Sequence, residues 1–225
     1  MLALRFPLTG LVAAVLTATA TLAHADVRIT EVAPWSSGNS PVGADWFELT
    51  NTGASALDLT GWKVDDSSAA FASAVALSGL TSLAAGQSAV FVEGTATTAA
   101  TFVSTWFGAS APSAFAIGYY SGGGIGLSAT ADAVNLFNAA GVLQAGVTFG
   151  ASDAVSPYQT FDNAAGLDGV ALTQLSVAGV QGAFVAMNSL TDIGSPGVVP
   201  EPESYALMLA GLGVLGMVAR RQRQS

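Results

Sequence analysis

Three carboxylates near one end of the chain, Glu31, Asp45 and Glu48, are the side chains best suited to chemistry. Calcium prefers several oxygen ligands, so these three are a candidate calcium site. Two of them also resemble the acid pair of a glycoside hydrolase, but a small domain rarely provides the cleft that such a pair needs. We favour a structural role, in which Glu31 and Glu48 accept hydrogen bonds from backbone amides and hold strand ends. No segment shows the dense Asp spacing of a dedicated calcium loop.

Two aromatic side chains, Trp35 and Tyr158, fall in segments that we expect to be loops. An exposed aromatic ring offers an apolar face on which a sugar ring can stack. Trp35 and Tyr158 are therefore candidate ligand-binding residues for a carbohydrate. Trp106 is expected to lie in the core instead, because it shares an apolar helical face with Ala99 and Phe102.

The N-terminal segment has the pattern of a secretory signal peptide. Arg5 provides a positive start, and residues 6–22 form an apolar stretch. The small residues Ala23 and Ala25 then flank a cleavage site just before Asp26. We predict that residues 1–25 form a signal helix that directs export by the Sec machinery and is removed.

The C-terminal segment 198–225 combines three features in a fixed order. Prolines in the triplet Pro200-Glu201-Pro202 hold it extended, and residues 204–219 predict an apolar helix. At 1.5 Å per residue this helix is about 24 Å long, slightly short for a hydrocarbon core of about 30 Å. The basic residues that follow are Arg220, Arg221 and Arg223. Since arginines stay cytoplasmic, we predict a short transmembrane helix with all preceding residues outside the inner membrane.

This tail closely resembles the PEP-CTERM sorting signal of Gram-negative bacteria, through its triplet, its apolar helix and its basic stop. The resemblance implies an exosortase as partner, cleavage near the triplet, and an association with exopolysaccharide and biofilm formation. An ordinary single-span anchor without processing is the alternative.

Charge and composition narrow the function of the remaining segment, residues 26–197. Only two cations, Arg28 and Lys63, stand against thirteen carboxylates, so nucleic-acid binding is excluded. The single histidine, His24, leaves with the signal peptide, and the chain has no cysteine. A Ser-His-Asp triad, a cysteine nucleophile and the usual zinc site are therefore excluded, which predicts a protein that is not an enzyme.

Short apolar runs separated by Gly, Ser, Thr and Ala predict an all-β domain. The expected strands are 27–32, 46–50, 62–64, 89–93, 116–120, 133–137, 142–149 and 171–177. A four-residue turn, 138–141, joins two of them as a hairpin. The spacing of Ala99, Phe102, Val103 and Trp106 predicts one helix that ends at Gly108.

Three motifs in the first part of this segment lie at 28–33, 45–53 and 57–66. They contain Ile-x-Glu, Asp-Trp-x-Glu-Leu-x-Asn and Asp-Leu-x-Gly-Trp, and this succession is similar to the lamin tail domain. The looser matches are 83–87, 133–137, 141–149 and the Ser-Pro-Gly of 195–197. The resemblance implies an immunoglobulin-like β-sandwich with one inserted short helix. We expect Trp46 and Trp62 on neighbouring strands of its core.

Together these patterns predict an exported, exosortase-processed protein of the cell surface or extracellular matrix, anchored transiently in the inner membrane. Its sandwich would have a structural or adhesive role in an exopolysaccharide or biofilm context. The alternative is an exopolysaccharide-binding module, assisted by calcium; no other cofactor is expected. A hydrolase is the least favoured interpretation.

Overall fold

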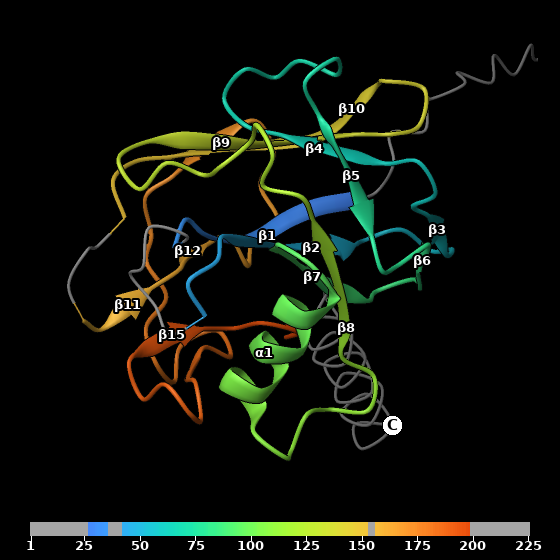
Figure 1. Cartoon of the computed structure of the whole chain (residues 1–225). Helices are drawn as coiled ribbons and strands as arrows, with labels where there is room; N and C mark the ends of the chain where they lie inside the picture. The colour runs from blue at the N-terminus through green and yellow to red at the C-terminus, as the bar shows by residue number, and fades with distance from the viewer. Residues whose placement is uncertain (1–26, 36–41, 153–155, 199–225) are drawn as a thin grey trace, which may run out of the picture.

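The computed structural model describes residues 27–35, 42–152 and 156–198 (Figure 1). Both predicted terminal segments lie outside these residues, so their helices are neither confirmed nor contradicted. Among the described residues, no helix has the length and apolar character needed to cross a membrane.

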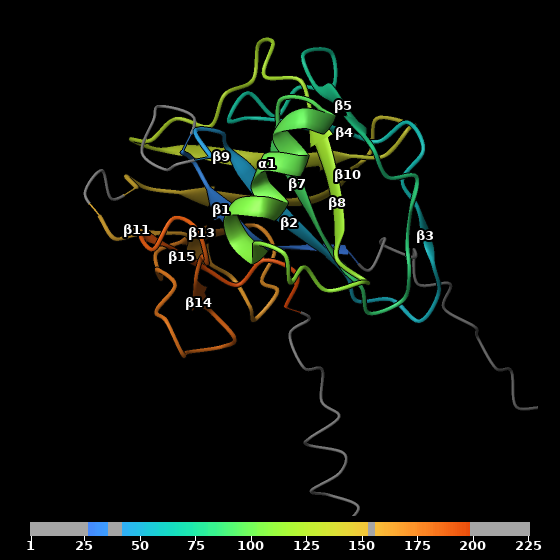
Figure 2. The ribbon, with the colours of Figure 1, turned by 60° about the horizontal axis from the view of Figure 1, so that its bottom comes forward.

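Ten hydrogen-bonded strands form one continuous sheet that folds into two facing layers (Figures 1 and 2). In spatial order the strands are β12 (Phe161–Asp162), β1 (Val27–Ala33), β2 (Trp46–Asn51), β7 (Ser88–Glu93), β8 (Ala116–Tyr120), β5 (Val75–Ser78), β4 (Lys63–Asp65), β9 (Asp132–Phe137), β10 (Leu143–Phe149) and β13 (Val170–Leu172). The arrangement is a mostly antiparallel β-sandwich, consistent with the immunoglobulin-like fold that the resemblance implied.

Two smaller sheets complete the described strands. One contains β11 (Tyr158–Gln159), β15 (Asp192–Gly194) and β14 (Phe184–Val185), and the other pairs β3 (Leu57–Asp58) with β6 (Ser82–Leu83). The first of these sheets lies on the same side of the sandwich as α1 (Ala96–Phe107), as Figures 1 and 2 show. Together they form a third layer that covers the outer face of β1, β2, β7 and β8.

Successive side chains of β2 point to opposite faces of the sheet, and both faces are covered, which explains why the fold has three layers. Phe47 and Leu49 point into the core between the two sandwich layers, whereas Trp46 points outward into a second core beneath α1. Every residue of β2 is buried, so both faces of this strand are covered. The expected proximity of Trp46 and Trp62 is therefore wrong. They belong to different cores, and β7, β8 and β5 separate β2 from β4.

The predicted helix is confirmed as α1. Thr95 caps its N-terminus through a capping box with Thr98, and the helix ends at Gly108, whose φ of 56° suits glycine. Ala99, Phe102 and Trp106 are buried beneath it, as their spacing indicates.

All eight expected strands overlap an observed strand, although the overlap for the segment predicted as 171–177 ends at Leu172. Sequence patterns missed β3, β5, β6, β11, β12, β14 and β15. These strands have two to four residues, too few to show a clear alternation.

Candidate functional site

Glu31 and Glu48 lie directly opposite each other on β1 and β2. Both are fully buried on the outer face of the sandwich, beneath the third layer. A β-bulge between Ile29 and Glu31 shifts the register of β1 at this point. Two carboxyl groups are thus placed side by side away from water, a costly arrangement unless they gain hydrogen bonds.

Glu31 gains these bonds from the C-terminal part of the domain. Its Oε1 atom accepts a hydrogen bond from the Ser195 backbone amide at 2.7 Å and another from the Thr160 hydroxyl. Gly194 passes so close that a Cβ there would lie 2.6 Å from the same oxygen, so only glycine fits.

Glu48 makes an equivalent connection. Its Oε1 atom accepts a hydrogen bond from the Thr30 hydroxyl at 2.7 Å, and its Oε2 atom accepts one from the Gly197 amide. The two glutamates therefore hold residues 192–198, which we call the C-terminal strap, against the first two strands. The expected structural role of both residues agrees with these contacts.

Burial changes the acidity of this pair. It raises the pKa of Glu31 to about 7, with a smaller contribution from the charge of Asp162. Burial, and then repulsion from Glu31, raises the pKa of Glu48 to about 8. The pair therefore retains protons near neutral pH, unlike exposed carboxylates.

Asp45, the third predicted metal ligand, holds a different segment of the chain. It is buried, and its Oδ2 atom accepts a hydrogen bond from the Leu127 amide at 2.7 Å, which ties the segment before β9 to the start of β2. Within residues 27–35, 42–152 and 156–198, no group of three or more His, Cys, Asp or Glu side chains is arranged to hold a metal. Glu31, Asp45 and Glu48 are therefore not gathered into one cluster of carboxylates in the described structure.

Trp35 is not an exposed sugar platform, which corrects the expectation from its loop position. Its side chain is 0% exposed and packs edge-to-face on Trp46, with ring centroids 6.0 Å apart. Tyr158 is half-buried and lies against Trp35 at 6.5 Å. Both rings belong to the second core, because the third layer covers a segment that looks like a surface loop in the sequence.

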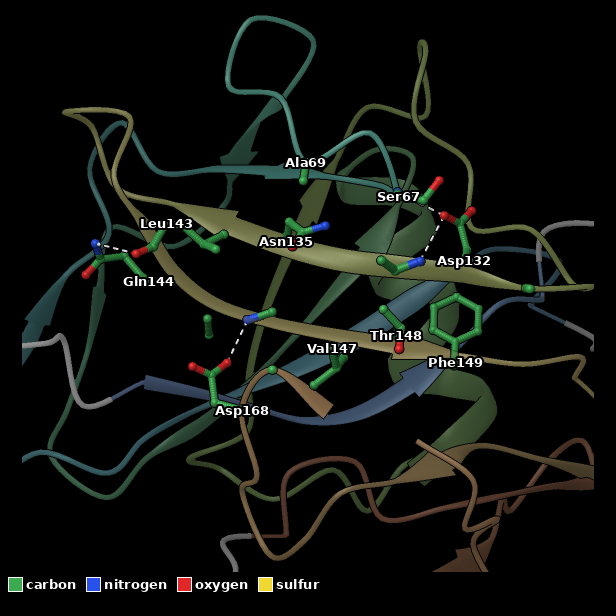
Figure 3. A pocket seen from close by; sticks show the side chains of 15 residues that line it. Ser67, Ala69, Asp132, Asn135, Leu143, Gln144, Val147, Thr148, Phe149 and Asp168 are labelled. Atoms are coloured by element: carbon green, nitrogen blue, oxygen red, sulfur yellow. Dashed lines mark hydrogen bonds between the residues drawn. The ribbon is translucent and has the colours of Figure 1, made fainter. Parts of the chain in front are cut away.

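An open trough on the opposite side of the molecule was not foreseen. It encloses about 600 Å³ over the outer face of the β9–β10 hairpin, and Figure 3 shows the side chains around it. Ser67 and Ala69 border one edge and Asp168 borders the other. The sequence signal for this trough is the run of small or polar residues on the outward face of the hairpin, such as Asn135 and Thr148.

Polar groups in the trough are partly committed to the fold. Asp168 accepts a hydrogen bond from the Gly146 amide at 2.8 Å, and Asp132 accepts one from the Ser67 amide at 3.0 Å (Figure 3). Thr148 is exposed, and Asn135 is half-buried with its amide group donating to the Asp66 carbonyl. The trough is therefore an open, mostly apolar surface with exposed polar groups at Ser67, Thr148 and Asp168.

Several residues of the site had weak or no sequence signals. Thr160 gives no signal, because a single threonine before a two-residue strand is unremarkable. Ser195 and Gly197 lie in the Ser-Pro-Gly segment already matched to the domain pattern, but their contacts with the two glutamates span more than a hundred residues of sequence.

The predicted sorting and cleavage residues lie outside the described residues. These are Ala23, Ala25, Asp26, Pro200, Glu201, Pro202, Arg220, Arg221 and Arg223.

Comparison with known proteins matches two parts of the chain to family models, residues 20–151 and 198–224. Residues 198–224 match the PEP-CTERM protein-sorting motif, which implies an exported exosortase substrate that is transiently anchored at the membrane. No curated protein and no solved structure matches the chain. Residues 20–151 match the Lamin Tail Domain model, more than half of the sequence, and the chain therefore belongs to the lamin tail domain family.

Proposed function

We propose that this protein is a non-catalytic structural or adhesive module of the cell surface or extracellular matrix, in an exopolysaccharide or biofilm context. One observation carries the proposal. The buried acids of the family motif close the fold against a strap that ends where the sorting motif begins. Glu31 and Glu48 are committed to holding the folded domain together, rather than facing a cleft where a substrate could bind.

This arrangement suits a domain that is exported and then released by cleavage of its sorting tail. Gly197 is bound by Glu48, and the sorting motif starts at the next residue. No long linker separates the two parts, so processing near the triplet releases a domain whose last strand is already fixed in place. The proposed activity lies in the surface that this domain displays.

Replacing Glu201 tests the processing step. Glu201→Ala should leave a full-length, membrane-retained species, measured by fractionation and by the mass of the released protein. Glu203→Ala removes the same charge two residues away and is the matched control, which should be processed normally. Unchanged release of the Glu201→Ala protein would contradict exosortase recognition of the triplet.

A second candidate function is exopolysaccharide binding, favoured by the open trough over β9 and β10. Its exposed Ser67 and Thr148 hydroxyls, beside a mostly apolar lining, suit contact with an extended neutral polymer. Thr148→Lys would fill the trough with a long side chain, whereas Thr60→Lys places the same charge at an exposed turn elsewhere. Loss of binding to native polysaccharide in the first variant alone would support this function, and no binding by the unmodified protein would reject it.

Calcium binding by Glu31, Asp45 and Glu48 stays a prediction. It requires a rise in melting temperature when calcium is added and a loss of that rise in a Glu31→Gln variant. The hydrogen bonds that these carboxylates already accept argue for an unchanged melting temperature.

A further inference from the structure

Large apolar side chains are exposed together at one end of the third layer. Val185, Met187 and Leu190 are 42%, 53% and 76% exposed. They border a groove of about 360 Å³ whose floor includes Phe107 and Phe184. We call these five residues the exit patch.

Hydrogen bonds to the end of α1 hold the exit patch rigidly. The Met187 amide donates to the Trp106 carbonyl at 3.1 Å. Asn188 donates from its backbone to the Thr105 carbonyl at 2.9 Å and from its side chain to the Ser104 carbonyl at 2.7 Å. The apolar side chains are therefore presented on a fixed surface, and they are not the tip of a loose loop.

Leu190 is an unusual residue for its position. Its φ of 59° lies in the left-handed region, which a leucine adopts only at an energetic cost. An exposed turn with this conformation normally carries Gly or Asn. A strained and exposed leucine therefore suggests that its side chain has a partner.

The described chain ends beside this patch. A Cβ placed at Gly182 would lie 2.6 Å from Val198, and Gly182 is two residues from Phe184. Gly197 approaches the Phe115 ring, which in turn contacts Phe107 with centroids 4.7 Å apart. Only residues 199–203 separate Val198 from the predicted apolar helix, a reach of roughly 20 Å even when extended.

The surroundings of the patch are almost free of charge. Residues 94–131, which include α1, contain no Asp, Glu, Lys or Arg. Residues 169–198 contain only Asp192, which is 0% exposed. A chain of formal net charge −9 thus presents a neutral, apolar face where its sorting tail departs. Such a face can approach a lipid surface without desolvating charged groups.

We infer that the exit patch rests on the phospholipid surface while the sorting tail is inserted in the membrane. The inference rests on the proposed insertion of that tail. Three exposed side chains are too few for stable membrane binding by themselves, but the tail holds them near the bilayer at a high effective concentration. The contact fixes the orientation of the folded domain and keeps the processing triplet at the membrane surface until cleavage.

Single cysteine reporters test this contact cleanly, because the chain has no cysteine. Met187→Cys and Leu190→Cys carry an environment-sensitive dye on the uncleaved chain in phosphatidylcholine vesicles that contain spin-labelled lipids. Leu143→Cys, also exposed but on β10, is the matched control, since β10 and α1 lie on opposite sides of the molecule (Figure 1). Leu207→Cys reports insertion of the tail itself.

We expect loss of fluorescence at positions 187, 190 and 207 but not at 143. If the dye at position 207 is quenched, but the dyes at positions 187 and 190 are quenched no more than the dye at position 143, the lipid contact is wrong and the tail insertion stands. No quenching at 207 would reject the insertion on which both proposals depend. If the dyes at positions 187 and 190 become shielded from water without vesicles, and more so at higher protein concentration, a second copy of the chain covers the patch. This result would also overturn the lipid contact.

A charged substitution adds a second, independent readout. Leu190→Asp should abolish quenching of the reporter at 187 while leaving that at 207 unchanged. Leu167→Asp is the control, because Leu167 is 54% exposed and lies outside the patch. Equal quenching at 187 in both variants would contradict the inference.

Discussion

Residues 27–151 supply eight of the ten strands of the sandwich, whereas residues 156–198 supply β12, β13 and the small sheet of the third layer. These two regions are built on different principles. All strands longer than three residues in the described chain lie in the first region, which also supplies most of the buried residues of the core between the two sandwich layers. The second region has strands of two or three residues and depends on α1 and on the buried acids of the sandwich. The family match ends at residue 151, so it covers the first region but not the second.

This difference explains the position of the family acids. Short strands provide few backbone hydrogen bonds, so side-chain acceptors must satisfy the amides of the strap. Glu31 and Glu48 belong to the matched region but bind residues of the unmatched one. We expect the sandwich to be the stable unit and the strap to open first.

Truncating a core tryptophan in the first region should have the largest effect. Trp62→Ala is expected to lower the free energy of unfolding by about 3–5 kcal/mol, because the cavity lies within the sandwich core. Urea unfolding monitored by circular dichroism measures this change. A free energy of unfolding close to that of the unmodified protein would show that Trp62 is not part of the core, and would contradict the distinction between the two regions.

Removing an acid should affect the second region selectively. Glu48→Ala leaves the Gly197 amide and the Thr30 hydroxyl without their acceptor, at a cost of about 1–3 kcal/mol. Amide hydrogen exchange should accelerate in residues 192–198 more than in β7. Asp58→Ala, at an exposed position of β3, is the control. Equal acceleration across both regions would indicate that they open as one unit.

The raised pKa values of the glutamate pair predict an unusual pH dependence. These two groups bind protons more tightly in the folded state than in the unfolded state. Their contribution to stability should therefore be greatest near or below pH 4.5. It should decrease as the pH rises towards about 8.

Glu48→Gln should flatten this slope, as measured by melting temperature across the same pH range. Asp168→Asn, which alters a surface carboxylate of the trough, should retain the slope. A slope unchanged by Glu48→Gln would show that other groups produce the pH dependence.

Relieving the backbone at Leu190 should have the smallest effect, and in the opposite direction. Leu190→Gly removes a side chain that is 76% exposed and suits the positive φ, so stability should rise by up to about 1 kcal/mol. Leu167→Gly, which is exposed without a positive φ, should be neutral or destabilising. A less stable Leu190→Gly protein would show that Leu190 supports the fold itself.

Local patterns predicted much of the first region. Alternating apolar residues located the long strands, and Gly141, with a φ of 77°, closes the expected hairpin turn. The helix followed from its apolar spacing and its ends from Thr95 and Gly108. These signals are contained within a few neighbouring residues, so they do not depend on the rest of the chain.

Trp35 and Glu31 show where such patterns fail. The segment around Trp35 has loop composition, yet a layer formed more than a hundred residues later covers its ring. The sequence predicts that Glu31 accepts hydrogen bonds from backbone amides, but its partners Thr160 and Ser195 lie 129 and 164 residues away. Long-range contacts of this kind leave no periodic trace in a single sequence.

The sequence alone determined the sorting motif, the mainly β character and the absence of histidine and cysteine from residues 26–197, because each depends only on residue type and local order. The N-terminal export signal stays a prediction from the same kind of pattern. Tertiary structure decided which core each side of β2 packs against, what the buried acids hold, and that the exit patch lies near Val198, the last described residue. The physical reason is that the burial of a carboxylate or a tryptophan depends on the segments that pack over it. Those segments are distant in the chain.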